Sequence, residues 1–544
     1  MTDIEIPLGK RTKFYRFFEM LPGLISFGTI LLPIILSLIN PLYGAVFIIV
    51  YIIAWFVKAI GMSIRVVQGY NALQRATRID WAGRLKDLQN PAAAVKERHY
   101  LGSWRAHLHE QNLEQLAQTV NAKKPSDIYN AIIIATYNET MEILEPTIQA
   151  VLESEYDMKR VILTIAYEER GGEAIENTVR ELKKRYQGKF KDFLLVQHPK
   201  DLPGEVIGKG GNITYAGFEL QREVKRQGID PENVIVTTLD ADNRPHKSYF
   251  AYLTYEYIVH PEPRYVAFQP LALFLNNIWD VPAPMRVIAT GNSFWNVVNS
   301  LRPHMLRNFA AHSQSLAALE DMNFWSVRTI VEDGHQFWRS YFRYDGHYDV
   351  VPLYVPIYQD AVLSETYRKT LRAQFVQLRR WAYGASDVAF VAWQVFRRDS
   401  KTPRIDGISK CFRLLESHVS WAAAPFILLF GAWAPLFINP ESSRSIVAHQ
   451  LPNIASGLQQ LAMIGLFIAV FLSFKMLPPR PERYKRRRNV WMLAQWVLMP
   501  ITSIIYGSAA AFTSQTRLLI GKYLDKFDVT EKAVKTDQGE TISS

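Results

Sequence analysis

Residues 233–245 read NVIVTTLDADNRP, an apolar and β-branched run that ends in two aspartates separated by one residue. Such residues favour a strand, and the Asp, Asn and Pro that follow are typical of a turn. Four further runs of this kind are AIIIAT (131–136), RVILTIA (160–166), DFLLVQ (192–197) and YVAFQP (265–270). They alternate with helical patterns, which predicts an α/β domain with a mainly parallel sheet flanked by helices. Ligands of such domains bind at the carboxyl ends of the strands, where we therefore look for a site.

Two acidic motifs are candidates for that site. Asp240 and Asp242 follow the strand at 233–240 and can share a hard divalent cation such as Mg²⁺ or Mn²⁺. Taken alone, the motif is equally compatible with a turn or a helix cap. Glu332 and Asp333 precede an apolar helical stretch, where acidic residues also serve as N-terminal caps. Each motif by itself leaves the structural alternative open.

A third motif, QLRRW at residues 377–381, places Gln377, Arg380 and Trp381 on one face of a helix. A guanidinium can bind a phosphate through two parallel hydrogen bonds, and an indole offers a flat surface on which a sugar ring can stack. The alternative is an ordinary amphipathic helix with its Trp in the core. The motif therefore favours a phosphorylated sugar only in combination with the acidic residues.

The first third of the chain carries a membrane signal. Residues 20–57 contain no charged side chain. A helix of that length would extend roughly 57 Å, nearly twice the hydrocarbon core of a bilayer at about 30 Å. A break at Asn40 and Pro41 therefore predicts two spans, a transmembrane hairpin over residues 21–60.

Composition divides the rest of the chain. Beside the hairpin we expect a cytosolic N-terminus at 1–20, amphipathic or interfacial helices at 61–125, the cytosolic α/β domain at 126–395, an interfacial helix with two to three spans at 396–520, and a tail at 521–544. Residues 419–440 and 455–474 suit one span each. Residues 489–516 form either one kinked span or a span followed by an interfacial stretch.

The charge balance points to a bilayer as the partner. The net charge is +11, from 62 Lys and Arg against 51 Asp and Glu, and much of the surplus lies beside the spans. Residues 475–488 hold seven basic residues and one acidic residue, which is typical of a cytosolic loop. We therefore expect no nucleic acid partner. The single Cys411 excludes a disulfide framework and a Cys-rich zinc site.

Together the motifs resemble those of the processive membrane glycosyltransferases of family 2, which include cellulose, hyaluronan and chitin synthases. The matching segments, in the family's order, are Thr136-Tyr137-Asn138-Glu139, the GKGGN segment at 208–212 with Lys209, Asp240-Ala241-Asp242, Val331-Glu332-Asp333, and Gln377-Leu378-Arg379-Arg380-Trp381. The resemblance covers about residues 126–395 and the membrane layout. It implies a glycosyltransferase domain of the GT-A type, flanked by transmembrane helices.

The resemblance also implies roles for the matching residues. Asp333 would be the general base that takes the proton of the acceptor hydroxyl, and Asp242 would bind a divalent cation, Mg²⁺ or Mn²⁺, at the nucleotide diphosphate. The acceptor and diphosphate site would consist of Gln377, Arg380, Trp381 and Gln269. The donor would be held by Thr136, Tyr137, Glu139, Glu168, Lys209 and Asp240.

Two segments depart from the family's pattern. The second strand ends in Glu168 and Glu169, where the family usually has an Asp that contacts uracil. The segment FAAHSQSL at 309–316 matches the acceptor-side segment of the family only loosely. The nucleotide base and the acceptor therefore stay open.

The function implied is that of an integral protein of a bacterial inner or plasma membrane, a family 2 hexosyltransferase. It would transfer sugar from a nucleotide-sugar, a UDP-sugar in most of the family, to a growing polysaccharide, with inversion and coupled translocation. One alternative is non-processive transfer to a lipid carrier. Another is a non-catalytic secretion partner that binds nucleotide or glycan. The expected partners are the donor, a glycan or lipid-linked acceptor, the bilayer and accessory secretion subunits.

Overall fold

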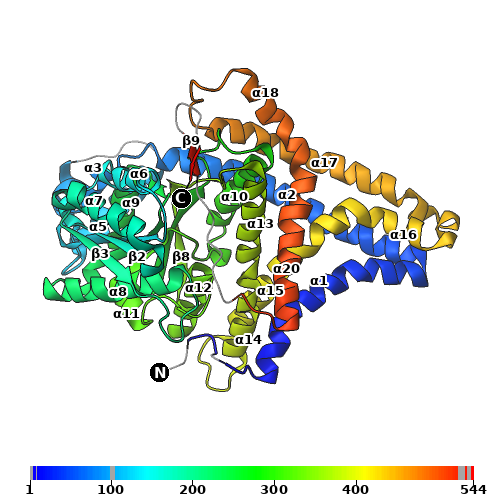
Figure 1. Cartoon of the computed structure of the whole chain (residues 1–544), viewed down its shortest axis with the longest axis horizontal. Helices are drawn as coiled ribbons and strands as arrows, with labels where there is room; N and C mark the ends of the chain where they lie inside the picture. The colour runs from blue at the N-terminus through cyan, green and yellow to red at the C-terminus, as the bar shows by residue number, and fades with distance from the viewer. Residues whose placement is uncertain (1–3, 8, 98–103, 525–532, 536–540, 544) are drawn as a thin grey trace.

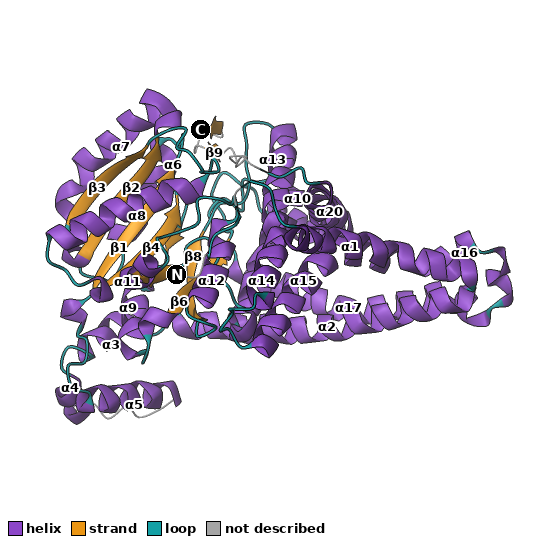
Figure 2. Ribbon diagram, turned by 90° about the horizontal axis from the view of Figure 1, so that it is seen from below, coloured by secondary structure: helices purple, strands orange, loops and turns teal. Residues whose placement is uncertain are grey.

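The computed structural model describes residues 4–7, 9–97, 104–524, 533–535 and 541–543. An α/β domain occupies one end of the molecule, and long apolar helices extend away from it (Figures 1 and 2). The expected N-terminal segment, amphipathic region and tail each include some residues that lie outside the described ranges.

The α/β domain contains one eight-stranded sheet with the order β3-β2-β1-β4-β7-β6-β8-β5. Its strands are β1 (Tyr129–Thr136), β2 (Val161–Glu168), β3 (Asp192–His198), β4 (Val234–Asp240), β5 (Arg244–Pro245), β6 (Val266–Leu273), β7 (Ser313–Ser315) and β8 (Asp349–Tyr358). Only β5 and β7 run antiparallel to their neighbours. The predicted α/β class with a mainly parallel sheet is therefore confirmed.

The five strands expected from the sequence correspond to β1, β2, β3, β4 and β6. The sequence reasoning missed β8, because Pro352 and Pro356 interrupt its apolar pattern and a proline cannot donate a ladder hydrogen bond. The pairing of β8 with β6 nevertheless persists, with a register shift between Pro270 and Leu271.

Helices cover both faces of the sheet (Figure 2). On one face lie α6 (Met141–Leu152), α7 (Gly172–Tyr186) and α9 (Tyr249–Val259); on the other lie α8 (Lys209–Arg226), α11 (Leu316–Asp321) and α12 (Glu332–Arg343). Successive β1 side chains alternate between the two cores: Ile132 packs with α6, and Ile133 packs with α8. Burial on both faces explains why the strands are apolar throughout.

Short helices precede the sheet: α3 (Trp81–Asp87), α4 (Pro91–Glu97) and α5 (Trp104–Gln118). The Trp81 ring of α3 stacks on Tyr252 of α9 with 3.7 Å between ring centroids. His109 of α5 shares a 2.8 Å hydrogen bond with the Tyr255 hydroxyl. This region is thus attached to the α/β domain on the α9 face.

Among the described residues, five helical segments are long and apolar enough to cross a membrane: Lys13–Ile39, Pro41–Ala76, Arg404–Ile438, Ile446–Met476 and Arg487–Ile520. The first two are α1 and α2, and Asn40 separates them. The Asn40 side chain accepts a 2.9 Å hydrogen bond from the Leu42 amide, and Pro41 begins α2, which is favourable at a helix start. The third segment contains α15 (Arg404–Phe430) and α16 (Ala434–Ile438), and the fourth is α17 (Ile446–Met476).

The fifth segment contains α18 (Arg487–Ala494), α19 (Met499–Thr502), a π-helical turn and α20 (Ala509–Ile520). The first four segments pack along one another, whereas Figure 1 shows α20 crossing their direction. The start of the fifth segment contacts α10 (Ala283–Ser300), because Arg286 donates a hydrogen bond to Gln495. Its end contacts α13 (Tyr367–Ala382), because Ser514 donates to the Arg379 carbonyl. The fifth segment therefore touches the α/β domain at both ends.

Candidate active site

The carboxyl ends of β1, β2 and β4 bring several of the predicted residues to one edge of the sheet. In the parallel register, Thr136 of β1 lies opposite Tyr167 of β2, and Ala135 lies opposite Asp240 of β4. Glu168 is the last residue of β2. The sheet thus aligns residues that are far apart in the sequence.

An ion pair between α8 and β4 occupies the centre of this edge. Lys209 is the first residue of α8, and its ammonium lies 2.7 Å from Asp240 Oδ1. Burial disfavours the charged form of Lys209, but the charges of Asp240, Glu332 and Asp333 outweigh it and raise its pKa above the ordinary value. The Lys209 ammonium is therefore held among three acidic residues.

Glu332 and Asp333 begin α12 and differ in their surroundings. Glu332 is buried, whereas Asp333 is half-buried and accepts a 2.7 Å hydrogen bond from the Gly334 amide. Burial, followed by the charge of Asp333, raises the pKa of Glu332 to about 8. Burial also raises the pKa of Asp333. At neutral pH, Glu332 is therefore mostly protonated.

Gly210 allows α8 to approach α12 closely. A Cβ atom at this position would lie 2.5 Å from the Ser326 carbonyl oxygen and 3.2 Å from the Glu332 Cβ. Only glycine avoids that overlap. The glycine-rich segment thus brings Lys209 next to the two acidic residues of α12.

Of the motif on α13, Arg380 lies close to the same acidic residues. After the dominant effect of burial, the Arg380 charge is among those that lower the pKa of Glu332 and of Asp333. Trp381 is half-buried, and its ring lies 5.9 Å from that of Phe274, just after β6. The Gln377 side chain accepts a 3.1 Å hydrogen bond from Gln374 of the same helix.

Glu139 organises the turn after β1. Its Oε2 accepts hydrogen bonds from the Thr136 hydroxyl (2.6 Å) and the Tyr137 amide (2.8 Å). Glu168 forms an ion pair with Arg170, whose guanidinium lies 5.3 Å from the centre of the Tyr137 ring. The ends of β1 and β2 are thereby connected through Arg170.

Asp242 and Gln269 are each fixed by a backbone amide. Asp242 Oδ2 accepts a 3.2 Å hydrogen bond from the Asp360 amide, just after β8. Gln269 is buried in β6, and its Oε1 accepts a 2.8 Å hydrogen bond from the Phe309 amide. Gln269 therefore connects the sheet to the segment 309–316.

The acidic residues fit a divalent cation only together with a phosphorylated ligand. Among the described residues, no group of three or more His, Cys, Asp or Glu side chains is arranged to hold a metal ion. Magnesium, however, is commonly bound by one or two carboxylates together with phosphate oxygens of the substrate. Asp240 and Asp242 satisfy that smaller requirement.

Two residues that the sequence reasoning did not assign also shape this edge. Asn212 donates hydrogen bonds to the carbonyls of Ala166 (2.9 Å) and Thr136 (3.3 Å) and so attaches α8 to β1 and β2. Its position inside the GKGGN segment was the available signal. Asp360 follows β8 and binds Asp242 through its amide. Asp360 could not be identified from the sequence, because Pro352 and Pro356 interrupt the apolar pattern of β8, the strand that precedes it.

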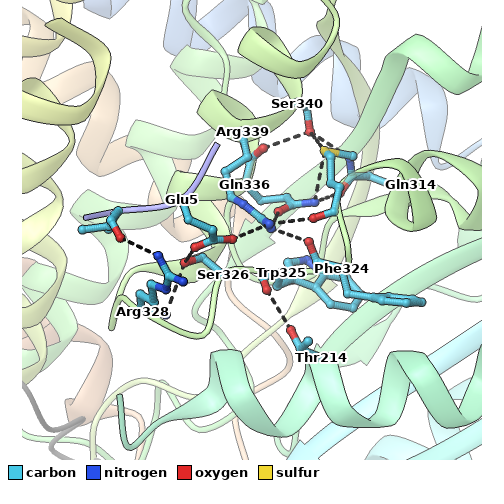
Figure 3. A network of polar contacts seen from close by, with 12 residues as sticks. Glu5, Thr214, Gln314, Phe324, Trp325, Ser326, Arg328, Gln336, Arg339 and Ser340 are labelled. Carbon is cyan, nitrogen blue, oxygen red and sulfur yellow. Dashed lines mark hydrogen bonds and ion pairs between the residues drawn. The ribbon is translucent and has the colours of Figure 1, made fainter. Parts of the chain in front are cut away.

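A polar network attaches the N-terminal segment to the loop before Asp333 (Figure 3). Glu5 accepts a 2.8 Å hydrogen bond from the Ser326 hydroxyl and forms a 2.5 Å ion pair with Arg339 of α12. Arg328 donates to the Ile6 carbonyl at 3.0 Å. The chain ahead of the first membrane helix therefore contacts the loop that leads to Asp333.

The same loop is attached to α8 and α12 by further contacts. Thr214 of α8 donates a 3.0 Å hydrogen bond to the Trp325 carbonyl, and the buried Arg339 donates to the Met322 carbonyl at 2.6 Å. The loop at residues 322–328 is thus held against both α8 and α12.

No protein-family model matches the sequence, and no curated protein matches it. Among solved structures, the chain is similar to mannosyltransferase PcManGT from Pyrobaculum calidifontis in complex with GDP-Man and Mn²⁺, with 15% identity over 85% of this chain and 100% of that chain and a TM-score of 0.40. It is also similar to S. aureus TarS 1–349 in complex with UDP-GlcNAc (11% identity, 76% and 96% of the two chains, TM-score 0.36). A third is glucosyl-3-phosphoglycerate synthase from Mycobacterium tuberculosis (11%, 53% and 79%, TM-score 0.28). Similarity at this level assigns no activity to this chain.

Proposed function

We propose that this protein is a membrane-embedded glycosyltransferase of the GT-A type that transfers a sugar from a nucleotide-sugar to an acceptor hydroxyl with inversion. The observation that carries the proposal is the cluster of Lys209, Asp240, Glu332 and Asp333 at the strand ends, with Arg380 close by. It combines acidic residues and cations in one place, which suits a phosphorylated ligand.

Asp333 is the general base in this proposal. The acceptor oxygen forms a bond to C1 of the sugar while the bond from C1 to the diphosphate oxygen breaks, and the acceptor proton moves to Asp333. A carboxylate with a raised pKa is a better proton acceptor at neutral pH. Glu332 is unsuitable, because it is buried and already protonated at that pH.

Positive charge for the leaving nucleoside diphosphate comes from Lys209 and Arg380. Lys209 retains its proton because Asp240 and the acidic pair of α12 raise its pKa. Fixed cations that face the developing negative charge stabilise the transition state. A divalent cation at Asp242 would supply further charge when it is bound together with the diphosphate.

For the acceptor, Trp381 offers the ring against which a sugar would stack. Its contact with Phe274 fixes the ring at the end of β6. We further propose, as the family resemblance implies, that the acceptor is a growing polysaccharide and that the protein belongs to the processive family 2 enzymes.

Replacing the proposed base tests the reaction. Asp333→Asn should lower sugar incorporation by about 100- to 10,000-fold, because general base catalysis commonly contributes that much. The measurement is transfer of radiolabelled sugar from a panel of nucleotide-sugars by membranes with equal amounts of inserted protein. The matched control is Asp349→Asn, an exposed residue at the start of β8, which should retain activity. Full activity of Asp333→Asn would refute the proposed reaction.

Product length separates the proposed acceptors. A ladder of long chains indicates processive synthesis, because a single transfer cannot produce it. One or two added sugars on an extracted lipid would refute the polysaccharide proposal and indicate the lipid carrier. If the intact protein neither transfers nor hydrolyses any of the nucleotide-sugars, the result would indicate a non-catalytic secretion partner.

A further inference from the structure

The loop between β6 and α10 (residues 274–282) lies at the edge of the sheet that holds the candidate active site. Both β6 and β4 run antiparallel to β7, so their carboxyl ends point to the same edge. Unlike most surface loops, this one is well packed. Its buried apolar side chains are Phe274, Leu275, Ile278, Trp279 and Val281. Such a loop has a fixed conformation, and its polar side chains can hold a partner in place.

Asn276 of this loop holds the main chain of Asp242. Its side-chain amide donates a 2.9 Å hydrogen bond to the Asp242 carbonyl. The Asp242 carboxylate is held from another side, by the 3.2 Å hydrogen bond from the Asp360 amide. The main chain and the carboxylate of Asp242 are thus each bound by a residue outside the motif at 240–242.

The two segments that hold Asp242 are also bound to each other. The Asn277 side chain donates a 2.9 Å hydrogen bond to the Ala361 carbonyl and accepts a 2.8 Å hydrogen bond from the Ala361 amide. Next to this pair, the Asn276 amide donates to the Gln359 carbonyl at 3.2 Å. The partners of the Asp242 carbonyl and carboxylate therefore form one connected unit.

The same loop is attached to the membrane region. The Asp280 carboxylate accepts two hydrogen bonds from Arg483, at 2.8 and 3.0 Å, and one from the Tyr484 hydroxyl at 2.8 Å. Arg483 and Tyr484 belong to the connection between α17, a candidate membrane span, and α18. The Asp280 amide donates to the Asn277 carbonyl at 2.9 Å. Hydrogen bonds thus lead from the end of a membrane helix to the unit that holds Asp242.

We propose that Asn276 and Asn277 are positioning residues for Asp242, and that the connection between α17 and α18 supports them through Asp280. The inference rests on the proposed function, in which Asp242 binds a divalent cation together with the nucleoside diphosphate. A carboxylate that is already oriented loses little freedom when the cation binds, so these contacts strengthen binding. Removing a side chain that orients a metal ligand commonly weakens metal binding by about 10- to 100-fold.

The affinity for Mn²⁺ tests the positioning residues on the purified full-length protein. Mn²⁺ is titrated in the presence of UDP and, in a parallel series, of GDP, and bound Mn²⁺ is measured by electron paramagnetic resonance. Asn276→Ala and Asn277→Ala should each weaken Mn²⁺ binding by about 10-fold or more. Asp242→Asn should weaken it at least as much. Thermal unfolding of the same preparations shows that each variant is folded.

Asn296→Ala is the matched control. Asn296 is half-buried like Asn276, and its side chain donates a 3.1 Å hydrogen bond to the Ala272 carbonyl of β6. Because this bond does not involve Asp242, the variant should retain the Mn²⁺ affinity of the wild type. If Asn276→Ala also retained it, while Asp242→Asn lost it, the inference would be overturned and the proposed function would stand. Retention of the affinity by Asp242→Asn would overturn both.

Asp280→Ala tests the support from the membrane region. This variant should weaken Mn²⁺ binding, by less than Asn276→Ala does, because it acts through Asn277. Asp399→Ala is its control, since Asp399 likewise binds a single arginine, Arg397, through two hydrogen bonds. It should leave Mn²⁺ binding unchanged. Equal Mn²⁺ affinities of the Asp280 and Asp399 variants would overturn the role of the connection between α17 and α18.

Discussion

Glu332 and Asp333 are neighbours in the sequence, yet they differ in their exposure to solvent. The difference comes from depth, since Glu332 packs against Gly210 while Asp333 is half-buried. Two adjacent carboxylates in a buried site cannot both ionise cheaply. The proposed base is therefore the residue that keeps contact with solvent.

The protonation of Glu332 predicts how stability depends on pH. Its pKa is raised from 4.5 to about 8. Between these values the folded protein retains a proton that the unfolded chain releases, so the free energy of unfolding falls as the pH rises. The loss is on the order of 1.4 kcal/mol for each pH unit within this window. Glu332→Gln should remove it, so that melting temperatures between about pH 5 and pH 8 become less dependent on pH than those of the wild type.

A matched control is Glu173→Gln, which changes an exposed acidic residue in the first turn of α7. This variant should keep the pH dependence of the wild type. If Glu332→Gln kept it as well, the proton would belong to another group.

At the scale of single residues, the sequence predicted which residue types gather at the strand ends. It did not predict their mutual contacts. The pairing of Lys209 with Asp240 depends on the close approach of α8 to α12, which Gly210 permits. The engagement of Glu168 by Arg170 required knowledge of where β2 ends. Both depend on distances of a few ångströms that no motif contains.

At the scale of elements, the N-terminal segment is a structural part of the α/β domain. Ile4 and Ile6 are buried in a core with Phe337 and Trp338 of α12, and Glu5 contacts the loop before that helix. No sequence pattern indicated this contact, because residues 4–6 show only a short alternation of apolar and acidic side chains. A segment of three residues is too short to show a hydrophobic periodicity, even when it packs against a distant part of the chain.

Removing the Glu5 charge should therefore affect the active site. Glu5→Gln weakens the contacts with Ser326 and Arg339, and a charged hydrogen bond contributes about 1.5–3 kcal/mol. We expect a lower melting temperature and a several-fold lower rate of sugar transfer, because the loop leads to Asp333. Thermal unfolding and initial rates on the same preparations measure both effects.

Lys10→Gln serves as the comparison, since Lys10 is exposed in the same segment. It should leave both the melting temperature and the rate unchanged. A folded Glu5→Gln protein with the wild-type rate would show that the segment only stabilises the fold.

At the scale of the whole molecule, the sequence predicted two membrane regions around one α/β domain, and left the number of C-terminal spans open. In the part of the chain that the structure describes, five segments are long and apolar enough to cross a bilayer. The fifth segment, however, contacts α10 at its start and α13 at its end. Apolar composition cannot distinguish a helix that crosses the membrane from one that lies against a domain. The distinction depends on the contacts of the segment, which only the structure provides.

These contacts predict that four segments cross the membrane and that both ends of the fifth lie on the side of the α/β domain. The single Cys411 is buried, so a Cys411→Ser background suits labelling. A membrane-impermeant maleimide added outside intact cells should label Glu441→Cys, between α16 and α17. It should label Lys522→Cys, just after α20, only after permeabilisation.

Lys485→Cys, in the loop before α18, provides the comparison for the side of the α/β domain. It should behave like Lys522→Cys. Labelling of Lys522→Cys in intact cells, with Lys485→Cys protected, would show that the fifth segment crosses the membrane.

The contact between Glu5 and Ser326 also constrains the order of biogenesis. The two residues are 321 positions apart. At about 5–20 residues per second, synthesis of the intervening chain takes on the order of tens of seconds. For most of that time α1 and α2 are complete and available for insertion, while Ser326 and Arg339, which bind Glu5 in the folded protein, are not yet synthesised. The nascent chain can therefore be anchored in the membrane before the loop that leads to Asp333 reaches its final contacts.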